Sequence, residues 1–305
     1  MNNPNELLIL GCGSATPTSN RFPTSQILRM RDELFLIDCG EGAQIQMRRN
    51  DVRFGQIDHI FISHLHGDHF FGLVGFLSSL HLLDKRKALH VYGPKDLWEV
   101  LQLQFKVSGS RLKYPIEFHS LDPNREERIL ETRKVVVDTL LMDHSIDTWG
   151  FKFTEKKKPR NLIKEKLEEY SIPKYIRDQI KGGADRDRGD GTVIPNEELT
   201  TAPPDPKTYV FFSDTAYKAD NAISISGADL IYHEATFADK DVARADKTKH
   251  STTMNAATMA QKGGVKKLII GHFSARYDDI DALVKEARTI FTQTFAANEG
   301  ERFSF

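Results

Sequence analysis

The sequence predicts an α/β protein with a layered core. Short apolar segments alternate along the chain with segments whose apolar residues recur at helical spacing. Several apolar segments end in a glycine-rich turn or in His and Asp residues, as strands do at the edge of a sheet where α/β folds build their sites. The 305 residues, 39% of them hydrophobic, are enough for a sizeable core.

The first half of the chain predicts most of the core strands and two helices. Apolar runs followed by glycine-rich turns indicate strands at 7–10 and 34–38, and a third strand at 58–63 runs into a histidine cluster. Apolar residues at helical spacing indicate a helix at 70–83. The other elements expected here are a strand and turn at 90–94, a helix at 95–106, and strands at 114–121 and 133–142.

The segment from about 155 to 207 differs from its surroundings. Apolar residues are sparse, turn formers are frequent, and Lys and Arg outnumber Asp and Glu between residues 152 and 188. The whole chain has a formal net charge of −1, which by itself weighs mildly against a nucleic-acid binder. We interpret the segment as an insertion that projects from the core, with a solvated charged face as the alternative explanation of its basic run.

The core resumes after the insertion. Residues 209–215 read as a strand ending in Asp, 228–233 as a strand ending in His233, and 268–272 as a strand ending in His272. Helices are expected at 252–262 and at 279–296.

Composition limits the cellular setting. There is no run of about 18 apolar residues, which argues against a membrane-spanning helix. Residues 1–6 lack the basic and apolar regions of a signal peptide, so we expect a cytoplasmic protein. Cys12 and Cys39 each sit beside glycine at a strand end, and we expect both to be buried structural thiols.

Three histidines and an aspartate follow the strand at 58–63 within six residues. In the run His64-Leu-His66-Gly-Asp68-His69, alternate residues can face one point and the following turn can bring the last two towards a second. Imidazole and carboxylate without thiolate suit Zn²⁺, with Mn²⁺ or iron as alternatives. Four residues cannot complete two metal sites, so distant donors are needed. The strand-end residues that supply them are His144, Asp214 and His272.

These motifs resemble the metallo-β-lactamase superfamily, and further motifs resemble its ribonuclease Z (tRNase Z) branch. The run at 10–18 is similar to the opening turn of that branch, and 38–44 (DCGEGAQ) is similar to its next motif. The remaining matches follow in order: Asp143-His-Ser, Ser213-Asp-Thr, His233-Glu-Ala-Thr, His250-Ser-Thr and 271–277 (GHFSARY). The resemblance spans essentially the whole chain and implies a single 1–305 domain, a metallo-β-lactamase αββα sandwich with a projecting exosite arm at about 155–207.

The resemblance also implies a role for each motif residue. Two Zn²⁺ ions per subunit are expected, with Mn²⁺ as a replacement. One is held by His64, His66 and His144, the other by Asp68, His69 and His272, and Asp214 bridges them. Asp68 is the implied proton acceptor for the attacking water, and His250, oriented by Glu234, the implied proton donor to the departing 3′-oxygen. Asp38 is expected to support the metal ligands from behind.

The implied activity is cleavage of precursor tRNA after the discriminator base, which removes the 3′ trailer and leaves a tRNA 3′-hydroxyl. In bacterial members the arm grips the tRNA elbow, so phosphate contacts are expected from the basic side chains Lys174, Arg177, Lys181, Lys158 and Arg160. Position 156 is Lys where the family loop has Pro, and position 43 is Ala where the family has Thr. Members usually form homodimers, so a homodimer is expected here.

Two other functions are compatible with parts of the sequence. A small-molecule phosphodiesterase or other hydrolase of the same fold would use the metal ligands without the basic arm. A metal-free RNA-binding scaffold would be expected to lack at least one ligand, yet all seven implied ligand positions carry a ligand-type residue. An active nuclease is therefore the favoured prediction.

Overall fold

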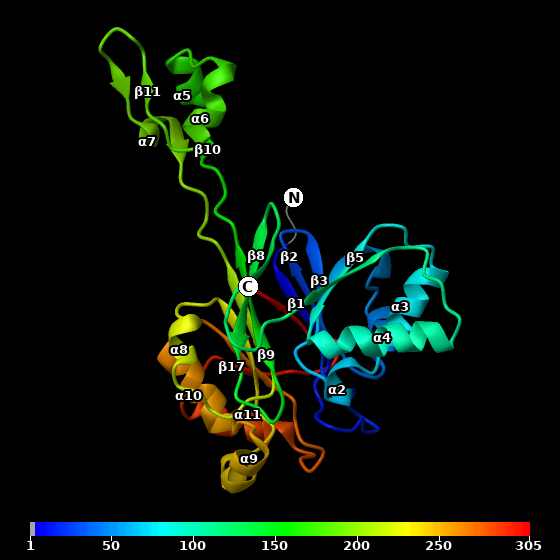
Figure 1. The fold of residues 1–305 in the computed structure, drawn as a ribbon. Helices are drawn as coiled ribbons and strands as arrows, with labels where there is room; N and C mark the ends of the chain where they lie inside the picture. The colour runs from blue at the N-terminus through cyan, green and yellow to red at the C-terminus, as the bar shows by residue number, and fades with distance from the viewer. Residues whose placement is uncertain (1–3) are drawn as a thin grey trace. The chain divides into compact units, whose positions relative to one another are not determined.

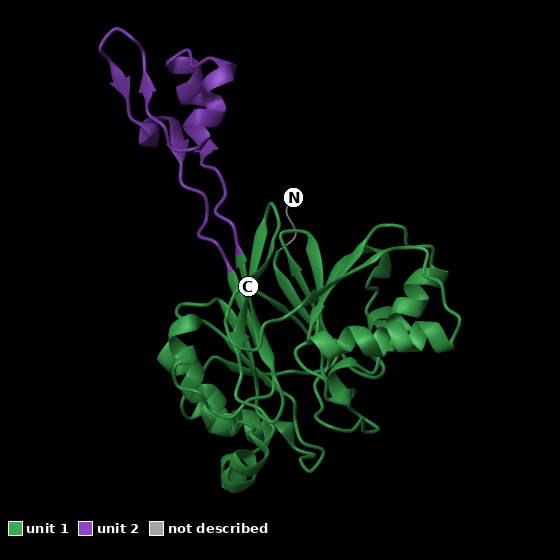
Figure 2. Cartoon of the chain, viewed as in Figure 1, with its two compact units in different colours: residues 1–154, 208–305 green, residues 155–207 purple. Residues whose placement is uncertain are grey.

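The computed structural model describes residues 4–305. Residues 1–3 of the segment 1–6, which was expected not to be part of a signal peptide, lie outside the described residues. Two compact units make up the chain, one of Met1–Thr154 with Thr208–Phe305 and one of Glu155–Lys207 (Figure 2). The larger unit holds two seven-stranded sheets with helices on their outer faces (Figure 1).

The first sheet has the strand order β18-β1-β2-β3-β4-β5-β6, antiparallel up to β3 and parallel from β3 to β6. Helices α1, α3 and α4 pack on its outer face through a cluster of buried residues that includes Leu8, Ile60, Phe76 and Leu101. The bounds are β1 Glu6–Gly11, β2 Ser25–Met30, β3 Glu33–Cys39, α1 Ala43–Arg49, β4 Ile57–Phe61, α2 Gly67–Phe70, α3 Leu73–Leu82, β5 Leu89–Gly93, α4 Lys95–Val107, β6 Ile116–Ser120 and β18 Arg302–Ser304.

The second sheet has the order β17-β16-β15-β14-β9-β8-β7, with β14 to β17 parallel. Its outer face is covered by α10 and α11, and α10 begins with a capping box formed by Thr252 and Asn255. The bounds are β7 Arg128–Glu131, β8 Val135–Leu141, β9 Trp149–Glu155, β14 Thr208–Phe212, α8 Asn221–Ser224, β15 Leu230–Glu234, α9 Val242–Thr248, α10 Thr253–Gly263, β16 Leu268–Gly271, α11 Ile280–Arg288 and β17 Thr294–Ala296.

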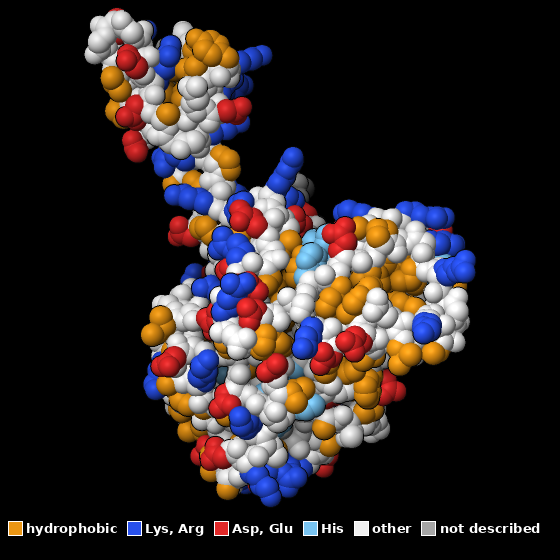
Figure 3. Space-filling view, in the orientation of Figure 1, with side chains coloured by type: hydrophobic (Ala, Val, Ile, Leu, Met, Phe, Trp, Pro, Cys, Tyr) orange, Lys and Arg blue, Asp and Glu red, His pale blue; other side chains and the backbone are white. Residues whose placement is uncertain are grey.

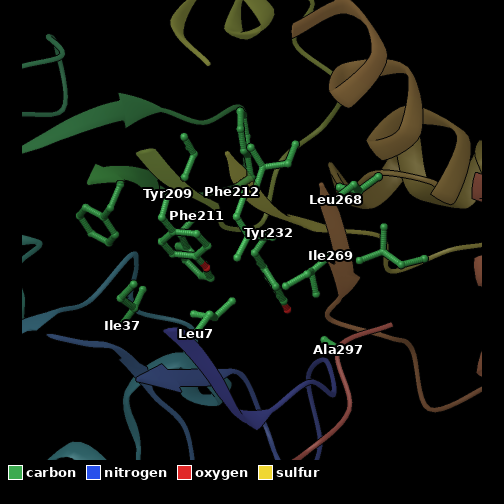
Figure 4. Close-up of a cluster of buried hydrophobic side chains, with 14 of the residues drawn as sticks. Leu7, Ile37, Tyr209, Phe211, Phe212, Tyr232, Leu268, Ile269 and Ala297 are labelled. Atoms are coloured by element: carbon green, nitrogen blue, oxygen red, sulfur yellow. The ribbon is translucent and has the colours of Figure 1, made fainter. Parts of the chain in front are cut away.

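The main core lies between the two sheets. Leu7 and Ile37 of the first sheet approach Phe211 and Tyr232 of the second, and all four side chains are essentially inaccessible to solvent (Figure 4). Fully burying side chains of this size stabilises a fold by about 1.5–3 kcal/mol each. Cys12 and Cys39 are free and buried, which confirms the expectation of structural thiols.

The smaller unit has a core of its own. Six buried aliphatic side chains pack together within it, among them Leu167, Ile180 and Leu199. Its elements are β10 Asn161–Leu162, α5 Lys164–Glu169, α6 Arg177–Lys181, β11 Arg186–Asp187, β12 Val193–Ile194, α7 Asn196–Leu199 and β13 Thr200–Thr201. The segment is therefore an ordered subdomain, not a structureless loop.

The predicted helix at 279–296 is wrong in its second half. Helix α11 ends at Arg288, and Thr294–Ala296 forms β17, which pairs in parallel with β16. The β-branched and aromatic residues after Arg288 gain more from this pairing than from further helical turns. The core elements that were not predicted are strands β2, β7, β9 and β18 and helices α1, α8 and α9. Within residues 4–305, no helix combines the length and the apolar character needed to cross a bilayer.

Candidate metal centre

The predicted ligands meet where the carboxyl ends of strands from both sheets come together. His64 follows β4, His144 follows β8, Asp214 follows β14 and His272 follows β16, so four chain segments distant in sequence deliver them. Except for His66 and Asp68, which are partly exposed, the seven implied ligands are buried. Figure 3 shows histidine side chains reaching the surface near α2.

One group consists of His64, His66, His144 and Asp214, whose potential ligand atoms all lie within 4.8 Å of one another. His66 Nδ1 is 3.1 Å from His64 Nε2 and 3.2 Å from His144 Nε2. Asp214 Oδ2 lies 3.6 Å from His64 Nε2 and 3.8 Å from His144 Nε2. Three nitrogens and one oxygen thus converge on one point.

The other group consists of Asp68, His69 and His272. His272 Nε2 lies 3.3 Å from His69 Nε2 and 3.3 Å from Asp68 Oδ2. Asp214 Oδ1 is 3.4 Å from His69 Nε2 and 3.3 Å from His272 Nε2. Because Oδ2 of Asp214 faces the first group and Oδ1 faces the second, this carboxylate can bridge two ions.

The spacing of these atoms fits a divalent metal ion. Two imidazole nitrogens bound tetrahedrally to one zinc at about 2.0–2.1 Å would lie about 3.3–3.4 Å apart, close to the observed separations. The opposite ring nitrogens of three ligands are already occupied: Nδ1 of His69 contacts Asp38, Nδ1 of His144 the carbonyl of Lys249 and Nδ1 of His272 the hydroxyl of Thr236. Their Nε2 lone pairs therefore remain free for a metal. Asp214 Oδ1 is buried, and no group of residues 4–305 donates a hydrogen bond to it.

Asp38 supports the ligands from within the core. Its Oδ2 lies 2.7 Å from His69 Nδ1, and its Oδ1 accepts from the backbone N–H of Ser63 at 2.7 Å. Burial raises the pKa of Asp38, and its pairing with His69 opposes that rise. Gly40 is needed nearby, because a Cβ at this position would come within 2.5 Å of the Asp68 carbonyl oxygen. The absence of a side chain at Gly40 therefore lets the turn after β3 pass close to the backbone at Asp68.

His250 and Glu234 form a hydrogen-bonded pair beside the ligands. His250 Nδ1 donates to Glu234 Oε1 at 2.8 Å, and Nδ1 lies 4.0 Å from Asp214 Oδ2. Glu234 is fully buried and held by Thr215 N–H on one oxygen and by Thr236 N–H and Oγ1 on the other. Burial alone would lower the pKa of His250, but the Glu234 carboxylate, with a contribution from Asp214, raises it to about 9. The imidazole is thus held protonated, and 15% of its side chain is exposed to solvent.

His233, also at a strand end, belongs to neither group. It stacks on Phe212 and its Nδ1 donates to the carbonyl of Glu234. Sequence reasoning missed Ser63, Lys249 and Thr236, which orient the ligands. Ser63 directly precedes the histidine cluster and Thr236 ends the His233-Glu-Ala-Thr motif, so both had a sequence signal. Lys249 acts through its backbone carbonyl, which has none.

The smaller unit contains all five basic residues predicted to contact tRNA. Lys158, Arg160 and Lys181 line a cavity of about 650 Å³ in which the unpredicted Lys157 also lies. Lys174 is exposed next to Tyr175, of which 81% is accessible. Arg177 and Arg160 serve the local fold as well, since Arg177 donates to the carbonyl of Ile172 and Arg160 to Thr200 Oγ1.

Comparisons with known proteins show what the chain is similar to. The family profile described as "Anti-Pycsar protein Apyc1" matches residues 5–163. A ribonuclease Z of Bacteroides fragilis is 44% identical over 294 residues, covering 96% of this chain and 97% of the relative. The crystal structure of the short form of human tRNase Z is 25% identical with a TM-score of 0.72 and covers 98% of each chain. YhfI of Bacillus subtilis, a metallo-β-lactamase fold protein, shares 18% identity with a TM-score of 0.69 over 99% of this chain and all of YhfI.

Proposed function

The chain belongs to the ribonuclease Z family and has the metallo-β-lactamase fold, and from this we propose that it is a zinc-dependent endoribonuclease that removes the 3′ trailer from precursor tRNA. It cuts after the discriminator base and leaves a tRNA 3′-hydroxyl. The observation that carries the proposal is the pair of ligand groups joined by the two oxygens of Asp214, with a protonated histidine beside them.

The ligand set proposed for one ion is His64, His66 and His144, and for the other Asp68, His69 and His272, with Asp214 between them. Two divalent ions bound there would lower the pKa of water and offset the negative charge that develops on the phosphate. Nitrogen and carboxylate ligands suit Zn²⁺, with Mn²⁺ as a replacement.

Asp68 is proposed as the acceptor of the proton from the attacking water. Burial would raise the pKa of this carboxyl, but His69 and His272 more than offset burial and hold it below its ordinary value. Asp68 is therefore ionised at neutral pH. Its partial exposure leaves it reachable from solvent, where the water and the phosphate must arrive.

His250 is proposed as the proton donor to the departing 3′-oxygen. Glu234 occupies its Nδ1 and keeps the ring charged, so Nε2 is left to donate. A cavity of about 340 Å³ is lined by His144, Trp149 and Lys218 among others, and it offers room for a nucleotide. The ring of His144 lies 5.0 Å from that of His250, between centroids.

The unit of residues 155–207 is proposed as the part that binds the body of the tRNA. One cavity is lined by four cationic side chains, Lys157, Lys158, Arg160 and Lys181, and by the carboxylates of Asp178 and Glu197. Such an excess of cations binds phosphates without reading the base sequence. Lys174 and Arg177 are proposed as further phosphate contacts, and the exposed ring of Tyr175 can stack on a nucleobase.

A homodimer is proposed as the assembled form. Apolar side chains gather on α3 and α4 of the described chain, where Leu82, Leu103 and Val107 are 78%, 61% and 70% exposed (Figure 3). A monomer rarely leaves a patch of this kind in water. A second copy that buries it would remove these side chains from solvent. Sedimentation equilibrium of the wild type and of Leu103→Asp tests this, with dimer and monomer as the respective expected states.

The activity is tested by mapping the 3′ end left on precursor tRNAs with and without an encoded CCA. Asp68→Ala is the inactive control. A second variant replaces residues 156–206 by a short glycine-rich turn, which the fold allows because Thr154 and Thr208 are paired neighbours on β9 and β14. We expect this variant to lose tRNA cleavage and to keep hydrolysis of bis(p-nitrophenyl) phosphate. Equal loss of both activities, or intact tRNA with the wild type, would reject the proposal.

A further inference from the structure

Strands β5 and β6 carry a second cluster of metal-binding side chain types, separate in sequence from the residues discussed above. His90 on β5 is the register partner of Glu117 on β6, and Tyr92 is the partner of His119. Because residues two apart on a strand face the same side of a sheet, His90, Glu117 and His119 all lie on one face. β6 is the edge strand of the first sheet, so this face is accessible from the side.

The three side chains converge on one point. His90 Nδ1 lies 3.1 Å from His119 Nε2 and 3.3 Å from Glu117 Oε2. All three potential ligand atoms are within 4.8 Å of one another. The 3.1 Å nitrogen separation equals that between His64 and His66 in the first ligand group.

Hydrogen bonds within this cluster can use only one hydrogen on His90 Nδ1. His90 Nδ1 can donate only one hydrogen, yet two acceptors, His119 Nε2 and Glu117 Oε2, lie at similar distances from it.

The rings are held in place by stacking. His90 stacks on His59 with centroids 4.9 Å apart, and His119 stacks on Tyr92 with centroids 4.4 Å apart. Tyr92 in turn stacks on the buried ring of Phe61 at 4.8 Å. Ligands fixed in this way lose little side-chain freedom when they bind an ion, unlike isolated surface histidines.

We propose that His90, Glu117 and His119 form a third metal site that binds a borderline divalent transition-metal ion such as Zn²⁺. Two imidazoles and one carboxylate suit such an ion better than Mg²⁺ or Ca²⁺, which take oxygen ligands. With Glu117 54% and His90 27% exposed, water can complete the coordination. A bound ion would tie the edge strand β6 to β5.

The test measures zinc binding and not catalysis. The full chain, saturated at its tightly bound positions and desalted, is titrated with Zn²⁺ against a chromophoric chelator. We expect one additional Zn²⁺ per chain, and for Glu117→Gln and His119→Gln an affinity for that ion at least about tenfold weaker. The matched control is His81→Gln, a histidine on α3 outside all ligand groups of residues 4–305, which should bind as the wild type does.

A second measurement guards against misfolding of a variant. Zn²⁺ added beyond the tightly bound ions should raise the melting temperature of the wild type and of His81→Gln, but not that of Glu117→Gln. Glu117 is largely exposed, so its substitution is expected to fold. Equal zinc uptake in all four proteins with equal thermal shifts in the three that are melted, or no additional ion in the wild type, would overturn the proposal.

Discussion

Replacing Glu234 by Gln should shift the pH dependence of cleavage without removing the metal ligands. The Glu234 carboxylate is the largest favourable influence on the charge of His250, which overcomes burial and raises the pKa of the imidazole to about 9. A neutral amide cannot stabilise that charge, and Asp214 is then the main remaining group that opposes burial, so the pKa of His250 falls from about 9 towards its ordinary value of about 6.5. Metal ions bound in the two ligand groups would act on His250 equally in the wild type and in Glu234→Gln. The quantity to compare is therefore the difference between the pKa values of His250 in the two proteins.

The sign of the effect follows from the proposed role. A proton donor acts in its protonated form, so activity is lost as the pH rises through its pKa. A decrease of about two units in that pKa moves the alkaline limb of the kcat/KM profile down by about two units. At pH 8 the variant should retain on the order of 1–10% of wild-type activity, whereas near pH 5.5 the two should approach each other.

Single-turnover cleavage of a 3′-extended precursor tRNA between pH 5 and 9 measures this shift. His250→Ala is the comparison, because it should lower activity at every pH in the accessible range. Metal content should be unchanged in Glu234→Gln, since Glu234 belongs to neither ligand group. An alkaline limb at the same pH in wild type and Glu234→Gln would refute the assignment of His250 as the donor oriented by Glu234.

Three further predictions concern the metal, the RNA and the core. Asp214→Asn should lower the metal content by at least one ion per chain, measured by plasma emission, because one of its oxygens faces each group; two retained ions would contradict bridging. Lys158→Ala with Arg160→Ala should raise KM for precursor tRNA and reduce its salt dependence while bis(p-nitrophenyl) phosphate turnover stays constant; a parallel loss of both would point to a folding defect. Phe211→Ala, at a fully buried position stacked on Tyr232, should lower the free energy of unfolding by about 3–5 kcal/mol in urea titration, and a loss under 1 kcal/mol would place the core elsewhere.

The elements of the core show where local sequence was sufficient. The strands at 34–38 and 58–63 and the helix at 95–106 were predicted close to the observed β3, β4 and α4, because their apolar spacing is set by the same packing that buries them. β2 was missed although it lies between β1 and β3, since the polar residues Ser25, Gln26 and Arg29 interrupt its apolar run. The second half of the helix predicted at 279–296 failed because β17 exists only through its pairing with β16.

The sequence by itself determined the kinds of ligand and the strand ends that bear them, because His, Asp and Glu side chains carry their chemistry wherever they lie. Only the tertiary structure decided that the two oxygens of Asp214 face different groups and that the Lys249 carbonyl orients His144. It also decided that His90, Glu117 and His119 meet, which depends on the register of β5 against β6. The contacts of a backbone carbonyl and the register of two strands cannot be read from residue types, because both depend on residues far apart in the chain.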